Sequence, residues 1–213
     1  MSNLKAYNFG DWGRKYRPQM LEEMILPAAI KKVFITIRDR QAGPHLLLIG
    51  PHGSGKTTAA MLMAPSKERF RCHLTEAASN YNSLHNAILS QPGDWQSNIR
   101  NVALIDHADK LKPAVQLDLL KFIESLAPRN MYIVTANEQL KLAPAIRERL
   151  ITVDFAKMNG DPDLREQMLD RAKAILDQEQ LKLDAGVVRS IVHRHFPNMY
   201  KVLEQLQYDA MLA

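Results

Sequence analysis

A glycine-rich stretch at residues 50–57, GPHGSGKT, matches the GxxxxGK[ST] phosphate-binding pattern in full. Glycines let backbone N–H groups close around a phosphate without Cβ clashes, and the positive end of the following helix dipole attracts an anion. In this pattern Lys56 reaches the β and γ oxygens of a nucleoside triphosphate, and Thr57 ligates Mg²⁺. We therefore expect the nucleotide to be bound by Gly53, Ser54, Gly55, Lys56, Thr57 and Thr58.

A second stretch, VALIDHADKL at residues 102–111, ends an apolar run with Asp106. A carboxylate at this place can hold the water shell of the Mg²⁺ ion, although an aspartate there can also cap the helix that follows. A glutamate at the next position would polarise the attacking water, but the chain has His107 instead. Imidazole can act as a base near its ordinary pKa of about 6.5, yet its reach differs. Because losing a general base costs about 10²–10⁴ in rate, we expect slow hydrolysis.

A third polar position, Asn137, follows the apolar run MYIVTA. Side chains at the carboxyl end of a buried strand face the crevice in which α/β sheets bind ligands. Asn137 can therefore orient the attacking water or contact the γ-phosphate. It can equally be a turn residue with a local hydrogen bond, and the sequence leaves both interpretations open.

These residues need a sheet to position them, and short apolar runs supply its strands. Near-continuous apolar runs are typical of strands that are buried on both faces of a parallel sheet. The runs are HLLLI (45–49), NVALID (101–106), MYIVTA (131–136), ITVDF (151–155) and, more weakly, RFRCHL (69–74). Between them PAVQLDLLKFIESL (113–126) has helical periodicity and begins with a proline, which suits a first helical turn. We expect an α/β domain over residues 1–157 with a parallel five-stranded sheet.

The pattern changes after the polar break MNGDPD at residues 158–163. The rest of the chain predicts three helices that start at Asp161 or Asp163, at Asp184 and at Pro197–Asn198. We expect residues 158–213 to form a small three-helix lid domain.

The composition excludes several classes of protein. The single cysteine, Cys72, has no partner for a disulfide or a zinc site, and no apolar span of about 18 residues predicts a membrane helix. The start of the chain lacks the apolar region of a signal peptide, so we expect a cytoplasmic protein with no membrane partner. A net charge of +5 is compatible with a nucleic-acid partner but does not require one.

The segment WGRKYRPQMLEEMILP, followed by LLLIGPHGSGKTT, LIDHAD, VTAN and AIRERL, resembles the AAA+ ATPases of the sliding-clamp-loader family. The chain is similar to replication factor C subunits and, more closely, to the large clamp-loader subunit of T4-like phages. The KYRP segment is the specific part of this resemblance, which covers about residues 12–205. It implies an AAA+ fold, ATP and Mg²⁺ as ligands, and a role in DNA replication.

The resemblance also implies roles for individual residues. Residues bordering the adenine would be Tyr16, Arg17, Pro18 and Ile25. Asp106 would serve the metal, and Asn137 would sense the γ-phosphate. Arg149, the only residue kept from the family's Ser-Arg-Cys motif, would reach as an arginine finger into the ATP of a neighbouring AAA+ subunit. Without the resemblance, a surface arginine that is solvated or paired with Glu148 is the simpler interpretation.

The family's helix beside the metal aspartate follows DNA, and here it carries lysines and Gln116, where the family usually has glutamine. If Lys110, Lys112 and Lys121 bind primer–template DNA, the contacts should be to phosphates and independent of sequence. On sequence alone, a solvated face is the simpler interpretation of these lysines.

Three features depart from the family. His107 replaces a glutamate, Tyr200 stands where the family has a second phosphate-binding arginine, and the helical collar domain of clamp loaders is not in this sequence. A collarless relative, a collar from another chain and a shortened chain all fit the last departure. We expect a subunit that uses ATP to load a sliding clamp on primer–template DNA. The alternatives are a helicase-loader or initiator relative and a non-hydrolysing, ATP-bound scaffold.

Overall fold

The computed structural model describes residues 11–40, 43–63, 72–76, 101–126 and 130–212. Five parallel strands form one sheet in the order β2-β3-β4-β1-β5. The strands are β1 (Leu46–Ile49), β2 (Cys72–Glu76), β3 (Asn101–Asp106), β4 (Asn130–Ala136) and β5 (Ile151–Asp154). The predicted α/β fold with a five-stranded parallel sheet is confirmed. Of the weak run at residues 69–74, residues 72–74 belong to β2, and residues 69–71 lie outside the described part of the chain.

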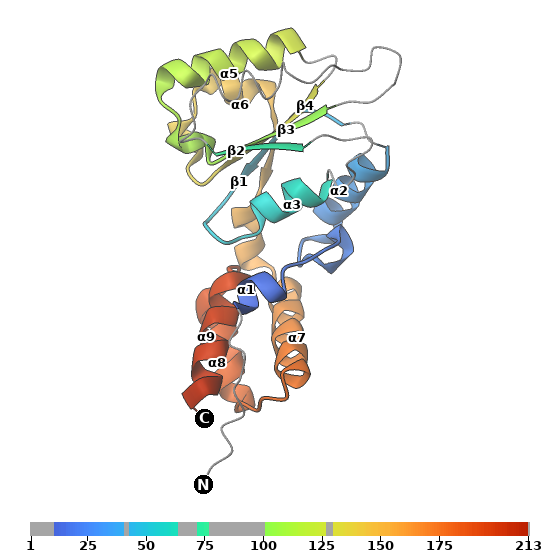
Figure 1. Cartoon of the computed structure of the whole chain (residues 1–213), viewed down its shortest axis with the longest axis vertical. Helices are drawn as coiled ribbons and strands as arrows, with labels where there is room; N and C mark the ends of the chain where they lie inside the picture. The colour runs from blue at the N-terminus through green and yellow to red at the C-terminus, as the bar shows by residue number, and fades with distance from the viewer. Residues whose placement is uncertain (1–10, 41–42, 64–71, 77–100, 127–129, 213) are drawn as a thin grey trace.

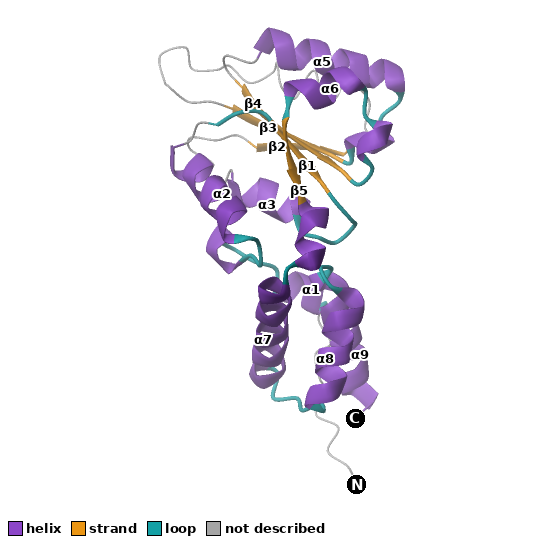
Figure 2. Cartoon of the chain, turned by 180° about the vertical axis from the view of Figure 1, so that it is seen from behind, coloured by secondary structure: helices purple, strands orange, loops and turns teal. Residues whose placement is uncertain are grey.

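Helices cover both faces of the sheet (Figure 1, Figure 2). On one face lie α2 (Ala28–Arg40) and α3 (Lys56–Met63), and on the other lie α5 (Pro113–Leu126) and α6 (Pro144–Arg149). Strand β1 shows why residues 46–49 are all apolar. Leu46 and Leu48 pack toward α2 and α3, whereas Leu47 and Ile49 pack toward α5 and α6. Period-two alternation thus buries every residue of a central strand.

Short 3-10 helices connect the larger elements. They are η1 (Leu21–Glu23), η2 (Ala108–Lys110), η3 (Gln139–Lys141) and η4 (Phe155–Gly160). Gln116 of α5 is 3% exposed and bonds to the residue that follows η2, to the last residue of η3 and to a residue just after η3. Its Nε2 donates to the carbonyls of Leu111 and Lys141 at 3.1 and 3.0 Å, and its Oε1 accepts from the Ala143 amide at 2.7 Å. Because this buried amide is satisfied by backbone, it fixes α5 against the loop that leads into α6.

Three helices follow the sheet and form the lid: α7 (Pro162–Gln178), α8 (Ala185–His195) and α9 (Met199–Leu212). Of the two aspartates predicted to start the first lid helix, Asp161 is the cap, since its Oδ1 accepts from the amides of Asp163 and Leu164. Asp184 caps α8 as predicted. The exact boundary between the two domains, near residue 157, stays a prediction. Among the described residues, no helix combines the length and apolarity needed to cross a bilayer.

A short helix near the start of the chain, α1 (Trp12–Lys15), packs beside α9 (Figure 1). Trp12 is 4% exposed and belongs to the apolar core of the lid, together with Leu203 and Leu206 of α9. The side chains of Lys15 and Tyr16 both reach Glu179, just beyond α7, at 2.6 Å. Sequence analysis assigned this segment to the first domain, but its side chains pack on the lid. The segment therefore ties the lid to the chain that enters the sheet.

Candidate nucleotide-binding site

The glycine-rich stretch forms the loop between β1 and α3, at the carboxyl end of the sheet. Gly53 and Gly55 have φ angles of +76° and +91°, in the left-handed region that glycine adopts without a steric penalty. Helix α3 begins at Lys56, so its first backbone N–H groups open toward the loop. The local sequence therefore builds a concave loop whose polar backbone groups are suited to an anion.

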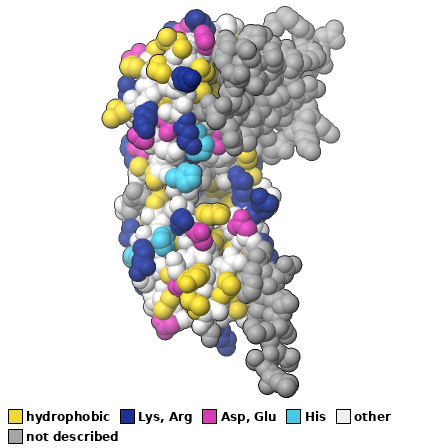
Figure 3. Space-filling model, turned by 60° about the vertical axis from the view of Figure 1, so that its left-hand side comes forward, with side chains coloured by type: hydrophobic (Ala, Val, Ile, Leu, Met, Phe, Trp, Pro, Cys, Tyr) yellow, Lys and Arg dark blue, Asp and Glu magenta, His cyan; other side chains and the backbone are white. Residues whose placement is uncertain are grey.

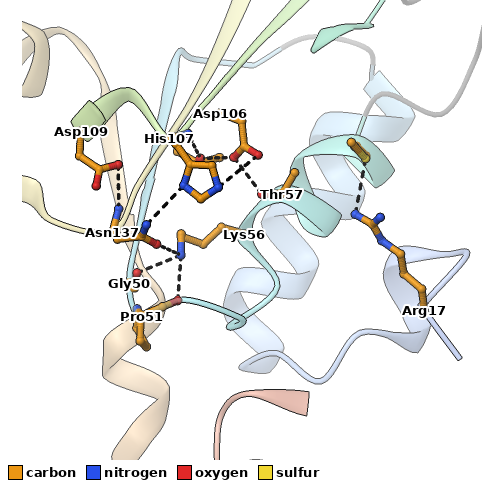
Figure 4. Close-up of polar contacts among 11 residues, drawn as sticks. Arg17, Gly50, Pro51, Lys56, Thr57, Asp106, His107, Asp109 and Asn137 are labelled. Carbon is orange, nitrogen blue, oxygen red and sulfur yellow. Dashed lines mark hydrogen bonds and ion pairs between the residues drawn. The ribbon is translucent and has the colours of Figure 1, made fainter. Parts of the chain in front are cut away.

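Lys56 is 5% exposed, although it is a lysine. Its ammonium donates to the carbonyls of Gly50 and Pro51 at 2.9 and 2.8 Å and to Oδ1 of Asn137 at 3.0 Å (Figure 4). Burial lowers the pKa of Lys56, and the nearby carboxylates of Asp106 and Asp109 act in the opposite direction. A buried cation that is held only by neutral oxygens is poised to receive a strongly anionic ligand.

Asp106, at the end of β3, is 7% exposed and accepts two hydroxyl hydrogen bonds on the same oxygen. Thr57 donates to Oδ1 at 2.9 Å, and Thr135, which is fully buried at the end of β4, donates to the same atom. The helix-cap interpretation of Asp106 is wrong, because η2 begins after His107 and has no side-chain cap. The pairing of Thr57 with Asp106 brings together the two oxygen ligands that the sequence predicted for Mg²⁺.

His107 has a left-handed backbone, with φ of +56°, and its amide donates to Thr135 Oγ1 at 3.0 Å. The side-chain amide of Asn137 determines which nitrogen of the His107 ring carries the proton. Because Asn137 Oδ1 accepts from Lys56, its Nδ2 is the atom that faces His107 Nδ1, at 3.3 Å. The Nδ1 atom is then the acceptor and Nε2 carries the proton, toward Asp106 Oδ2 at 3.8 Å. The lone pair that a general base would offer to water is therefore engaged (Figure 4).

Asn137 is more than a turn residue, since its side chain joins Lys56 to His107 and its backbone amide donates to Asp109 Oδ1 at 3.3 Å.

A second histidine lies nearby: the ring of His52, in the glycine-rich loop, stacks on His107 with centroids 5.9 Å apart and an interplanar angle of 26°. Histidine side chains are visible at the level where the sheet-containing part and the lid meet (Figure 3).

A cavity of about 460 Å³ opens beside this cluster, between the loop, the N-terminal segment and the lid. The residues predicted to border the adenine, Tyr16, Arg17, Pro18 and Ile25, all line it, as do Gly53, Ser54, Gly55, Lys56, Thr57, Thr58 and His107. Asp106 and Asn137 are not among the lining residues, but they hydrogen-bond to Thr57 and Lys56, which are. Arg17 is held toward α3, where its Nε donates to Thr58 Oγ1 at 3.1 Å. The cavity thus joins the predicted phosphate and adenine residues in one space.

The lid residues of this cavity, which include Met168 and Arg171 of α7 and Leu203 of α9, were not predicted from the sequence. They lie more than a hundred residues from the glycine-rich loop, and only their helical spacing marks them as one face. Tyr200 lines the cavity too, with its ring against Gly13, where a Cβ atom would collide with it. The correspondence of Tyr200 to the family's second phosphate-binding arginine stays a prediction.

Arg149 and the three lysines lie away from this cavity. Arg149 ends α6 and lies on the surface, as the simpler interpretation held, but it pairs with Glu124 of α5 at 2.8 Å and not with Glu148. The lysines Lys110, Lys112 and Lys121 are exposed, and Lys121 pairs with Asp118 at 3.3 Å. Neither group contributes to nucleotide contacts within this chain, so any role for them involves another molecule.

The cavity fits the phosphates of a nucleotide. Ser54 Oγ is buried in the loop and has no hydrogen-bond partner, although Ser54 lines the cavity. A buried hydroxyl without a partner costs free energy unless a ligand supplies an acceptor. Together with the Lys56 ammonium and the paired oxygens of Thr57 and Asp106, it provides donors for phosphate and ligands for a divalent cation.

The chain was compared with known proteins. Residues 46–156, more than half of the 213, match the model of the ATPase family associated with various cellular activities (AAA). The replication factor C small subunit of Staphylothermus marinus is 27% identical over 95% of this chain and 62% of its own length. That of Methanococcus maripaludis is 26% identical over 95% of this chain and 65% of its own length. The chain thus spans about 62–65% of these relatives.

Solved structures agree on the fold. The RuvB Holliday junction branch migration motor of Thermotoga maritima superposes with a TM-score of 0.70 at 21% identity, covering 90% of this chain and 64% of that one. The predicted resemblance to replication factor C is confirmed by the relatives, whereas the closeness to phage subunits stays a prediction. From the matched family model, the chain belongs to the AAA family of ATPases.

Proposed function

We propose that this chain is a clamp-loader-type subunit that binds ATP with Mg²⁺ and hydrolyses it slowly, within an assembly of AAA+ subunits. The observation that carries the proposal is the buried Lys56 ammonium in a cavity that Tyr16, Arg17 and Pro18 also line. A nucleoside triphosphate places anionic phosphates and a flat base in such a cavity. The similarity to replication factor C small subunits supports the role in replication.

Each residue of the site has a defined task in this proposal. Lys56 exchanges its carbonyl partners for phosphate oxygens, and Ser54 donates its unpaired hydroxyl. Thr57 and Asp106 hold the cation, which when bound neutralises phosphate charge. Asn137 keeps its hydrogen bond with Lys56 and lies close enough to that ammonium to respond to a γ-phosphate bound there.

His107 makes hydrolysis slow in this proposal. A general base needs a free lone pair within reach of the attacking water, but Asn137 Nδ2 occupies the Nδ1 lone pair. This same contact favours a second candidate function, a subunit that holds ATP without hydrolysing it and serves as a nucleotide-bound scaffold.

Arg149 is the residue that we assign to a neighbouring subunit's ATP, which makes oligomerisation part of the mechanism. Its pairing with Glu124 is a surface ion pair, with side chains 60% and 43% exposed, and such pairs contribute little to stability. The arginine is therefore available for a stronger anion. Further proposed partners are a sliding clamp and primer–template DNA, the latter through the phosphates contacted by Lys110, Lys112 and Lys121.

Titration with a fluorescent ATP analogue and steady-state hydrolysis, each with and without primed DNA, test the proposal. The parent chain should bind the analogue, and Lys56→Ala should abolish its stabilisation by ATP, because the charge and the two N–H donors that Lys56 turns from carbonyls to phosphate are lost. Lys32→Ala, on the exposed face of α2, is the matched control and should behave as the parent. Unchanged ATP stabilisation in Lys56→Ala removes the nucleotide site. Binding without turnover in any assembly selects the scaffold function.

Arg149→Ala separates the neighbour's contribution from nucleotide binding. It should leave ATP binding by the chain intact and lower turnover in the assembly, since an arginine finger contributes about 10³–10⁵ in rate. Assembly turnover equal to that of the parent would make Arg149 a surface residue.

A further inference from the structure

The side chain of Asn198 connects the lid to the glycine-rich loop. Asn198 precedes α9, where its Oδ1 accepts from the Lys201 amide at 3.1 Å and so caps the helix. Its Nδ2 donates in the other direction, to the carbonyl of His52 at 3.1 Å. One side chain therefore binds the first turn of a lid helix and the backbone of the phosphate-binding loop.

Gly53 makes this approach possible. A Cβ atom at Gly53 would overlap the amide of Asn198, and the φ angle of +76° is itself one that other residues rarely adopt. The Asn198 amide therefore rests directly on the loop backbone. The contact is specific in position, because the loop offers space for the asparagine only where it has no side chain.

Because the peptide bond is planar, a hydrogen bond to the His52 carbonyl also fixes the orientation of the Gly53 N–H. The carbonyl of His52 and the N–H of Gly53 belong to one trans peptide, so they point in opposite directions. His52 and Gly53 line the cavity, as do Pro197 and Met199 on either side of Asn198. The bond from Asn198 to the His52 carbonyl therefore sets the direction of this peptide, and the Gly53 N–H points away from the Asn198 amide.

We propose that Asn198 is a positioning residue that presets the Gly53 N–H for the phosphate chain of a nucleoside di- or triphosphate and transmits the docking of the lid to the loop. The inference rests on the proposed nucleotide binding. Tyr200, two residues on, offers no cationic group at this junction, so the asparagine supplies a lid contact that acts on the loop and not on the ligand itself.

Asn198→Ser tests this role because serine also caps helices well but is too short to reach His52. Asp184→Ser, the same kind of exchange at the cap of α8, is the matched control for any general weakening of the lid. The readouts are the affinities for fluorescent ATP and ADP analogues, the melting temperature without ligand, and hydrogen exchange of the loop at residues 50–56.

We expect Asn198→Ser to weaken both analogues about three- to tenfold, the effect of one hydrogen bond, with faster exchange in the loop and a melting temperature like that of Asp184→Ser. ATP and ADP should be affected equally, since both place a β-phosphate in the loop. Affinities that match those of Asp184→Ser would reduce Asn198 to a helix cap and overturn the proposal. A parent chain that binds neither analogue would instead overturn the proposed function, and this inference with it.

Discussion

The two walls of the cavity differ in chemistry. The sheet-side wall contains buried polar groups, Lys56 and Ser54, backed by Asp106 and Thr135. The lid-side wall presents Met168, Leu203 and Tyr200 together with the cationic Arg171 of α7. The buried groups suited to phosphate are therefore concentrated on the sheet-side wall, whereas the lid-side wall adds apolar surface and one arginine. We expect bound ATP to affect the lid through packing on this wall and through Asn198, without a cation at residue 200.

The sheet-side wall departs from an efficient catalytic site at His107, and His107→Glu gives the largest expected effect. If the engaged imidazole is what slows the reaction, a glutamate should raise hydrolysis by about 10²–10⁴. Steady-state turnover in the assembly measures this change. His107→Gln, which has similar size and no basic group, should stay slow.

The left-handed backbone at residue 107 adds a cost in stability to the His107→Glu substitution. Histidine tolerates a φ angle of +56° better than glutamate does, so His107→Glu should also melt at a somewhat lower temperature. A fall in turnover beyond this loss of stability would show that the imidazole has a catalytic role of its own.

The lid-side wall depends on Trp12, and its removal should have the next largest effect. Trp12→Ala empties a site that is 4% exposed within the core formed by α7, α8 and α9, which should cost about 3–5 kcal/mol in the free energy of unfolding. Urea denaturation measures this cost. Leu140→Ala, at a residue that is 88% exposed, is the control, and an equal cost in both variants would contradict the assignment of Trp12 to the lid core.

The same contrast explains what the sequence could predict. The phosphate-binding loop and the strand ends are contiguous motifs, so the roles expected of Lys56, Thr57 and Asp106 follow from local spacing, and the structure brings them together. The central strand β1 was predictable because burial on both faces leaves an uninterrupted apolar run, Leu46–Ile49, whereas the edge strand β5 is partly exposed.

The lid side was harder to predict because its residues come from distant parts of the chain. Trp12 stands next to polar residues in the sequence, and nothing local shows that it packs on α9. The pairing of Arg149 with Glu124 likewise depends on how α5 and α6 lie beside each other. Asn198 carries an ordinary helix-cap signal, while its bond to the His52 carbonyl exists only in three dimensions.

Tyr200→Arg sharpens the comparison by placing a cation at residue 200, in addition to Arg171 of the lid-side wall. Tyr200 is 49% exposed, so the change should leave the lid core intact. A charge-assisted hydrogen bond to the γ-phosphate should strengthen ATP binding by about 1.5–3 kcal/mol with a smaller effect on ADP. Titration with both nucleotides measures the difference. Tyr208→Arg, farther along α9, is the control, and equal gains for ATP and ADP would contradict a γ-phosphate contact.

The smallest expected effect concerns the link between the walls, where the Tyr16 hydroxyl donates to Glu179 at 2.6 Å. Burial raises the pKa of Glu179, but the hydrogen bonds from Lys15 and Tyr16 outweigh it, so the pKa is lowered from its usual 4.5. A lowered carboxyl pKa contributes stability that is present above 4.5 and is lost as the pH falls through the folded-state value.

Tyr16→Phe should therefore cost about 1 kcal/mol near neutral pH, measured by urea denaturation, and the difference from the parent should shrink once the pH falls below that window. Tyr208→Phe, at a residue that is 58% exposed, should show no such pH dependence. If the cost of Tyr16→Phe instead stays constant into acid, then ring packing, and not the bond to the Glu179 carboxylate, holds the N-terminal segment on the lid. The two walls would then be joined by apolar contact, chiefly through Trp12.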